Sequence, residues 1–203
     1  MDRLLRLLTL ALVAAALAGC ATGFKLDNQV QSFSALPALP AQPTFRFERM
    51  PSQQGDPHQT TLELMADPAL HRAGLRRDDA SPQYSVQVAG RSQQVLSPWA
   101  SPYGWGWGGW NAGFGGWGGR GAAWGLGFGG PWPAWDSYWF RREVSVIVRE
   151  LPSNRVVYET SALNDGPWYD SGAVLPAMFD AAMQGFPNPP PGPRRVDIQV
   201  GAR

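Results

Sequence analysis

The sequence has few of the side chains on which most enzymes and metal sites depend. Its 203 residues include one cysteine (Cys20), one lysine (Lys25) and two histidines (His58 and His71). No motif in the sequence supplies a catalytic partner for His71, so we interpret it as a surface or boundary residue. The sequence also has no G-x-S-x-G motif, no H-E-x-x-H motif and no paired metal-ligand spacing. We therefore expect no enzymatic activity, no metal and no cofactor.

The chain also carries little net charge, formally +1, and contains no apolar run long enough to cross a membrane. Removing residues 1–19 leaves 15 basic side chains (17 − 2) and 15 acidic ones (16 − 1), a balance that argues against a nucleic-acid partner. The apolar run over residues 7–17 is shorter than the roughly 20 residues that a spanning helix needs. The scattered carboxylates are interpreted as surface residues of turns and strand faces, among them Asp136, Glu143, Asp165 and Asp170.

What the N-terminus does contain is typical of an export signal. Arg3 and Arg6 precede the apolar run, whose length suits the roughly 7–15 residues of a signal-peptide core. The following residues, Leu-Ala-Gly-Cys, resemble the lipobox of bacterial lipoproteins, in which the cysteine is acylated with chains such as palmitate and becomes the mature N-terminus. The alternative is a plain secretory signal with an incidental cysteine. We predict a signal peptide over residues 1–19, lipidation at Cys20 and a short tether over residues 20–23.

Acylation of Cys20 would leave the protein with no free thiol. A disulfide framework, a cysteine zinc cluster and a cysteine nucleophile are then all excluded. Acyl chains contribute about 0.8 kcal/mol of membrane affinity per buried CH₂, so several together would hold the protein firmly. The covalent lipid is the only non-protein group that we expect.

Alternation of apolar and polar residues predicts strands in the mature chain. A hairpin is expected over residues 139–162, with Val144, Val146 and Val148 on one face and a turn at residues 152–154. The other predicted strands cover residues 25–33, 44–50, 82–90 and 194–200.

Spacings of three and four between apolar residues predict two helices. In the first, Asp56 caps the N-terminus, Pro57 occupies the first position and Gly74 follows the end, while Pro68 predicts a kink or a break. In the second, Asp170 or Ser171 is the cap. The apolar stripes consist of Leu62, Met65, Ala66, Ala69, Leu70 and Ala73, and of Leu175, Met178, Phe179, Ala182 and Met183.

The order of these elements predicts the fold class. We expect one α+β domain over residues 24–200, a largely antiparallel sheet with two helices packed on one face. A long Gly/Trp-rich insertion, at about residues 100–136, separates two of the strands.

Several stretches together resemble a known family. They are the lipobox, "ALHRAGL", "YSVQV", "VSVIVRELPSNRVVYETSA" and "FPNPPPGPRRVDIQV". The chain is similar over about residues 24–200 to the bacterial lipoprotein family called domain of unknown function 4136. The resemblance implies a compartment and a fold but no catalytic residues.

The insertion is the most unusual part of the chain. Fourteen glycines lie between residues 104 and 130, and their match to G-x-G-x-x-G lacks the strand and helix that a dinucleotide site needs. Three interpretations remain: a passive low-complexity loop, an interfacial segment, and a glycan-binding segment whose indoles stack on sugars. The candidate interface residues are Trp105, Trp107, Trp110, Trp117, Trp124, Trp132 and Trp135.

Together these features predict a membrane-anchored lipoprotein of the cell envelope with a binding or structural role. The alternative is a glycan-binding or glycan-active accessory protein that uses the Trp-rich loop. The expected partners are the membrane, through the lipid anchor, and an envelope protein or glycan. Ala21 follows the cysteine, and by the sorting rule of enteric bacteria the lack of aspartate there favours the periplasmic face of the outer membrane, with the inner membrane as the alternative.

Overall fold

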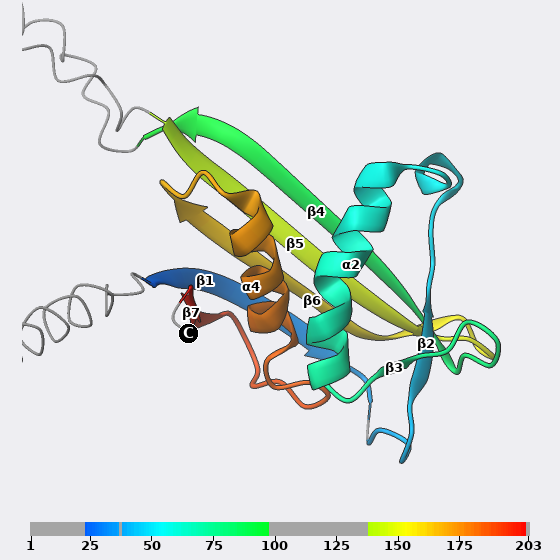
Figure 1. The fold of residues 1–203 in the computed structure, drawn as a ribbon. Helices are drawn as coiled ribbons and strands as arrows, with labels where there is room; N and C mark the ends of the chain where they lie inside the picture. Colours follow the sequence, from blue (N-terminus) through cyan, green and yellow to red (C-terminus); the bar gives the residue numbers. More distant parts are fainter. Residues whose placement is uncertain (1–22, 37, 98–137, 202–203) are drawn as a thin grey trace, which may run out of the picture.

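The computed structural model describes residues 23–36, 38–97 and 138–201. In this part of the chain, seven strands form one sheet that carries two α-helices (Figure 1). The elements are β1 (Phe24–Ser34), β2 (Thr44–Phe47), the 3-10 turn η1 (Pro51–Gln53), α2 (Pro57–Arg72), β3 (Arg76–Arg77), β4 (Tyr84–Leu96), β5 (Tyr138–Glu150), β6 (Arg155–Gly166), α4 (Ser171–Met183) and β7 (Arg194–Val200).

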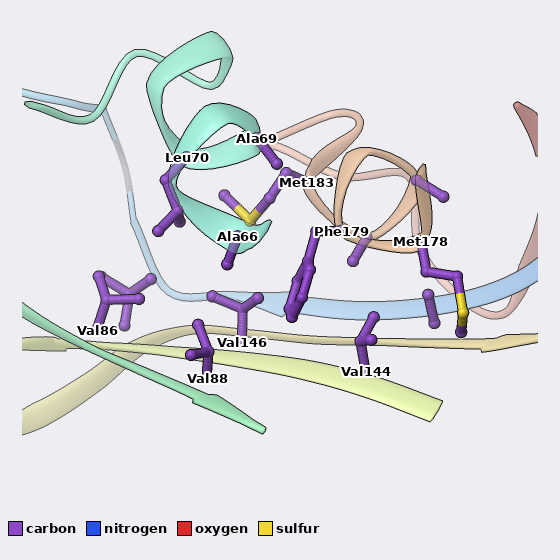
Figure 2. Packing of buried hydrophobic residues seen from close by; sticks show 14 of the residues in the cluster. Ala66, Ala69, Leu70, Val86, Val88, Val144, Val146, Met178, Phe179 and Met183 are labelled. Atoms are coloured by element: carbon purple, nitrogen blue, oxygen red, sulfur yellow. The ribbon is translucent and has the colours of Figure 1, made fainter. Parts of the chain in front are cut away.

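The sheet is mixed, so the prediction of a largely antiparallel sheet is wrong. The strand order is β3-β2-β4-β5-β6-β1-β7. The pairs from β4 to β7 are antiparallel, but β2 runs parallel to both of its neighbours, β3 and β4. The reason is the connection after β2, which passes through α2 before the chain returns as β3, and a helical crossover of this kind joins parallel strands. The two helices do lie on one face of the sheet (Figures 1 and 2).

The predicted strands and hairpin are present, but some bounds differ: β4 extends to Leu96 and β6 to Gly166, while β2 already ends at Phe47. β4 and β5 pair over their whole lengths, from Tyr84 opposite Glu150 to Leu96 opposite Tyr138. β5 and β6 form the predicted hairpin, and its turn places Asn154 at φ 52°. The two-residue strand β3 was not predicted, because two arginines in a row carry no alternation.

The helix signals in the sequence are also confirmed. The Asp56 carboxylate accepts from the His58 N–H at 2.8 Å, and the Asp170 carboxylate accepts from the Gly172 N–H at 2.8 Å. Gly74 ends α2 with φ 99°, a conformation that side chains disfavour. Of the kink or break predicted at Pro68, the break does not occur, because α2 continues through Pro68 as one helix.

The core lies between the sheet and the two helices (Figure 2). In the close-up, Phe179 of α4 points toward Val146 and Val144 of β5, while Met183 lies between the two helices. Gly90 of β4 lets α2 come close, because a Cβ atom there would lie 2.8 Å from Leu62 Cδ1. Most of both predicted apolar stripes is buried, namely Leu62, Ala66, Ala69, Leu70, Met178, Phe179, Ala182 and Met183, while Met65, Ala73 and Leu175 are partly buried against this core.

Candidate functional site

Several strand ends meet at one end of the sheet. The left end of the sheet in Figure 1, where β1 begins, also contains one end of each of the strands β4, β5, β6 and β7. The register fixes this convergence: Phe24 lies opposite Val200, and Leu96 lies opposite Tyr138. The loop that leads from β6 into α4 lies at the same end.

Large apolar side chains gather at this end. Phe24 stacks on Trp168 with ring centroids 4.0 Å apart, and Phe140 packs edge-on against Tyr169 at 5.8 Å. Tyr169, Leu96 and Tyr138 are exposed, with 86%, 77% and 57% of their surface open to solvent. We call Phe24, Leu96, Tyr138, Phe140, Trp168 and Tyr169 the aromatic end of the sheet.

A buried arginine holds the β6–α4 loop within this end. Arg142 of β5 is fully buried. Its Nη2 donates to the carbonyl oxygens of Trp168 at 2.5 Å and Tyr169 at 3.3 Å, and its Nε donates to Ser171 Oγ at 3.2 Å. Its guanidinium carbon also lies 4.8 Å from the centroid of the Phe140 ring. One side chain therefore fixes the backbone of both loop aromatics and the start of α4.

Among the described residues, no buried carboxylate lies beside the charge of Arg142. Burial lowers the pKa of the Arg142 guanidinium, and the exposed Asp170 carboxylate acts in the opposite direction. Asn164 is the register partner of Arg142, and its Nδ2 donates to the Asp27 carbonyl at 2.8 Å. Polar side chains thus tie β5, β6, β1 and the loop together beneath the aromatic end.

Arg142 was not among the residues predicted from sequence, although the alternation of β5 contains the signal. Arg142 has the same parity as Val144 and Val146, so it must point to the same face as these core residues. Its neighbour Arg141 points to the opposite face, where it forms an exposed ion pair with Asp165 at 3.0 Å.

The residues predicted from sequence to form the site lie outside the described residues. This applies to the lipidation candidate Cys20 and to the tryptophans of the insertion, Trp105, Trp107, Trp110, Trp117, Trp124, Trp132 and Trp135. Asp136, which we interpreted as a surface residue, also lies outside the described residues. Both histidines, His58 and His71, are exposed, as are Glu143, Asp165 and Asp170.

Two hollows are lined by residues that the structure describes. One, of about 370 Å³, lies between the end of β1 and the proline-rich loop after α4 and is lined by Ser32, Phe33, Ser34, Leu36, Asn188, Pro189, Pro191 and Gly192. The other, of about 230 Å³, is lined by Asp27, Asn28, Gln29, Leu163, Asp165 and Arg195. Neither contains the aromatic end.

Within residues 23–36, 38–97 and 138–201, no group of three or more histidine, cysteine, aspartate or glutamate side chains is placed to hold a metal ion. Neither helix in these same ranges has the length and hydrophobicity that crossing a membrane requires.

Comparison with known proteins gives a family and distant similarities of structure. The chain is similar to a PDZ domain protein from Parabacteroides distasonis, with 13% identity and a TM-score of 0.47 over 93% of this chain and 42% of that chain. It is also similar to a PelC dodecamer from Paraburkholderia phytofirmans, with 9% identity and a TM-score of 0.44 over 80% of this chain and 99% of that chain. A search of curated proteins found no match. The sequence profile of the family Domain of unknown function (DUF4136) matches residues 29–188, which is 160 of the 203 residues, and the chain therefore belongs to this family.

Proposed function

We propose that this protein is a lipoprotein of the cell envelope, anchored through Cys20 at the periplasmic face of the outer membrane, with a binding or structural role and no catalysis. The observation that carries the proposal is the position of β1. It begins at Phe24, four residues after the only cysteine of the chain. Four residues span at most about 14 Å, so an acylated Cys20 would hold the aromatic end close to the membrane.

The polar groups of the aromatic end support a role other than catalysis. Arg142 donates to backbone carbonyls, Asp170 caps α4, and Asp165 pairs with Arg141. Each of these groups already has a structural task, which favours a surface that binds over one that transfers protons or attacks a substrate.

Lipidation is tested by labelling cells that express the protein with a clickable fatty acid. We expect the wild-type protein to carry the label and Cys20→Ser to lack it and to stay unprocessed or soluble. Label that persists on Cys20→Ser would contradict the proposal, because Cys20 holds the only thiol.

The binding role is tested by crosslinking in intact envelopes, followed by capture of the protein. We expect a protein or glycan partner that the wild-type chain retains and that a deletion of residues 104–130 loses. If the wild-type protein and the deletion variant capture the same partners, the Trp-rich segment does not take part in binding. This result would favour the interpretation as a passive loop. Capture of a glycan alone would favour the glycan-binding alternative.

A further inference from the structure

We propose that the aromatic end of the sheet lies in the interfacial layer of the membrane that holds the anchor. The opposite end of the sheet then points away from this membrane. The inference rests on the proposed lipidation of Cys20. It adds a second contact with lipid, made by folded residues rather than by the acyl chains.

Only a short segment separates the anchor from the sheet. Phe24 belongs to the aromatic end and is four residues from Cys20, a span of at most about 14 Å. Interfacial groups of proteins lie about 5–10 Å deep in the boundary between headgroups and acyl chains. A domain tethered this closely by β1 presents the start of β1 to the lipid before any other part of the sheet.

The exposed side chains of the aromatic end have the chemistry of an interfacial surface. Tyr169 and Tyr138 are open to solvent, and each has an apolar ring with a hydroxyl at its tip. Tyrosine and tryptophan are enriched at membrane interfaces because such side chains satisfy both the apolar and the hydrated layer. Leu96 is 77% exposed beside Tyr138, and its transfer into the apolar layer would be favourable because apolar surface would leave water.

Contacts within the protein hold this surface in place before it meets lipid. The Arg142 hydrogen bonds fix the backbone at Trp168 and Tyr169, and the stacking of Trp168 on Phe24 joins the loop to β1. A preorganised surface loses little conformational entropy on binding.

Charged side chains around this end pair with one another. Arg141 pairs with Asp165 at 3.0 Å, and Lys25 pairs with Asp197 at 2.6 Å. Because these charges are compensated within the protein, contact with lipid should depend on apolar burial. We therefore expect binding to zwitterionic phosphatidylcholine that changes little with salt.

The test uses one fluorescent label at each end of β4 in the acylated, full-length processed protein. Gln94 and Gln83 are both exposed; Gln94 lies opposite Phe140, and Gln83 precedes the far end of the strand. Eleven residues of strand separate them by about 35 Å. Because Cys20 would be acylated, Gln94→Cys and the matched control Gln83→Cys each add the only reactive thiol.

The labelled proteins are reconstituted in phosphatidylcholine vesicles that carry bromine on their acyl chains. We expect quenching at position 94 about threefold stronger than at position 83, because only the first label should reach the interfacial depth. We also expect iodide in the water to quench position 83 more than position 94. Equal lipid quenching at the two positions would overturn the inference.

A second variant ties the effect to the named side chains. Leu96→Ser, Tyr138→Ser and Tyr169→Ser together should reduce lipid quenching at position 94, whereas deletion of residues 104–130 should leave it. Unchanged quenching in the triple variant would overturn the inference. If the triple variant does not fold, the comparison of lipid quenching at positions 94 and 83 in the otherwise unchanged protein still tests the inference.

The outcomes separate this inference from the proposed function. Mass measurement of the processed protein reports acylation of Cys20, and its absence means that the proposed function has failed. An acylated protein whose position 94 is open to iodide and unquenched by lipid means that only the inference has failed. Shielding of position 94 that occurs only with envelope extract would assign the surface to a protein partner and overturn the lipid contact.

Discussion

Leu96 and Tyr138 face each other on the last rung of the β4–β5 ladder. The 41 residues between them, 97–137, therefore leave the sheet and return to it at the same point. Two strand ends held at adjacent positions can be joined by a two-residue turn. The ladder consequently sets no requirement for a long connection.

The first prediction is that the protein folds without residues 104–130. The strands that flank the connection contribute Val88 and Val146 to the core, and a shorter connection would join the same rung. We expect cooperative melting of the shortened protein within a few degrees of the wild-type temperature, measured by circular dichroism. A loss of cooperative melting would show that the segment belongs to the core.

The second prediction concerns the two faces of β5. Val146 is fully buried under the helices, so Val146→Asp should destabilise the domain by about 3–5 kcal/mol, a large part of a typical total of about 5–15 kcal/mol. Ser145 points to the opposite face and is partly exposed, so Ser145→Asp should cost less than about 1 kcal/mol. Urea denaturation measures both, and the reverse order of sensitivity would contradict the placement of the helices.

Local pattern was sufficient for most of the elements. The alternation of Val144, Val146 and Val148 and the Asp56 cap each act within a few residues, so the sequence predicts them directly. For the second helix, the sequence narrows the cap to Asp170 or Ser171. The parallel edge of the sheet depends on where α2 returns the chain, which no local pattern records. The prediction of a largely antiparallel sheet was wrong for this reason.

The polar contacts of the interior were harder to predict, because each joins distant parts of the chain. Glu63 is buried on α2, where its carboxylate binds Arg49 at 2.6 and 2.7 Å. Arg142 reaches residues 26 to 29 positions later. A charged residue in an apolar alternation can be noticed in the sequence, but its partners come only from the fold.

The third prediction is a loss of stability in acid that depends on Asp197. Hydrogen bonds from Lys25 and then Arg195 lower the pKa of Asp197 from 3.8 to about 2. Because the folded pKa lies below the unfolded one, ionised Asp197 stabilises the fold above about pH 4, and this contribution disappears as the pH falls toward 2. Asp197→Asn should therefore lose less stability than the wild type between about pH 5 and pH 2.5, as measured by urea midpoints.

Lys25→Met provides a second measurement for the same site. It removes the largest cause of the lowered Asp197 pKa, so the acid-dependent loss should be smaller than in the wild type. An acid dependence that is the same in all three proteins would exclude Asp197 as its source.

The last prediction compares the adjacent residues Arg142 and Arg141. Arg142→Met removes the donors to the Trp168 and Tyr169 carbonyls and to Ser171 Oγ, in a buried position where hydrogen bonds to a charged group contribute about 1.5–3 kcal/mol each. Methionine keeps the apolar volume and avoids burying a charge, which offsets part of this loss. We expect a net destabilisation of about 2–4 kcal/mol. Arg141→Met removes only an exposed ion pair with Asp165 and should cost about 0–1 kcal/mol.

Hydrogen exchange distinguishes the loss of loop anchoring from general destabilisation. If Arg142 anchors the β6–α4 loop, the amides of residues 168–172 should exchange faster in Arg142→Met even under conditions where amides of the β5–β6 hairpin remain protected. A variant that is merely less stable would instead lose protection evenly through global unfolding. Arg141→Met should keep the wild-type exchange pattern in both regions. Equal behaviour of the two variants would mean that the carbonyls of Trp168 and Tyr169 find other partners and that Arg142 does not set the shape of the aromatic end.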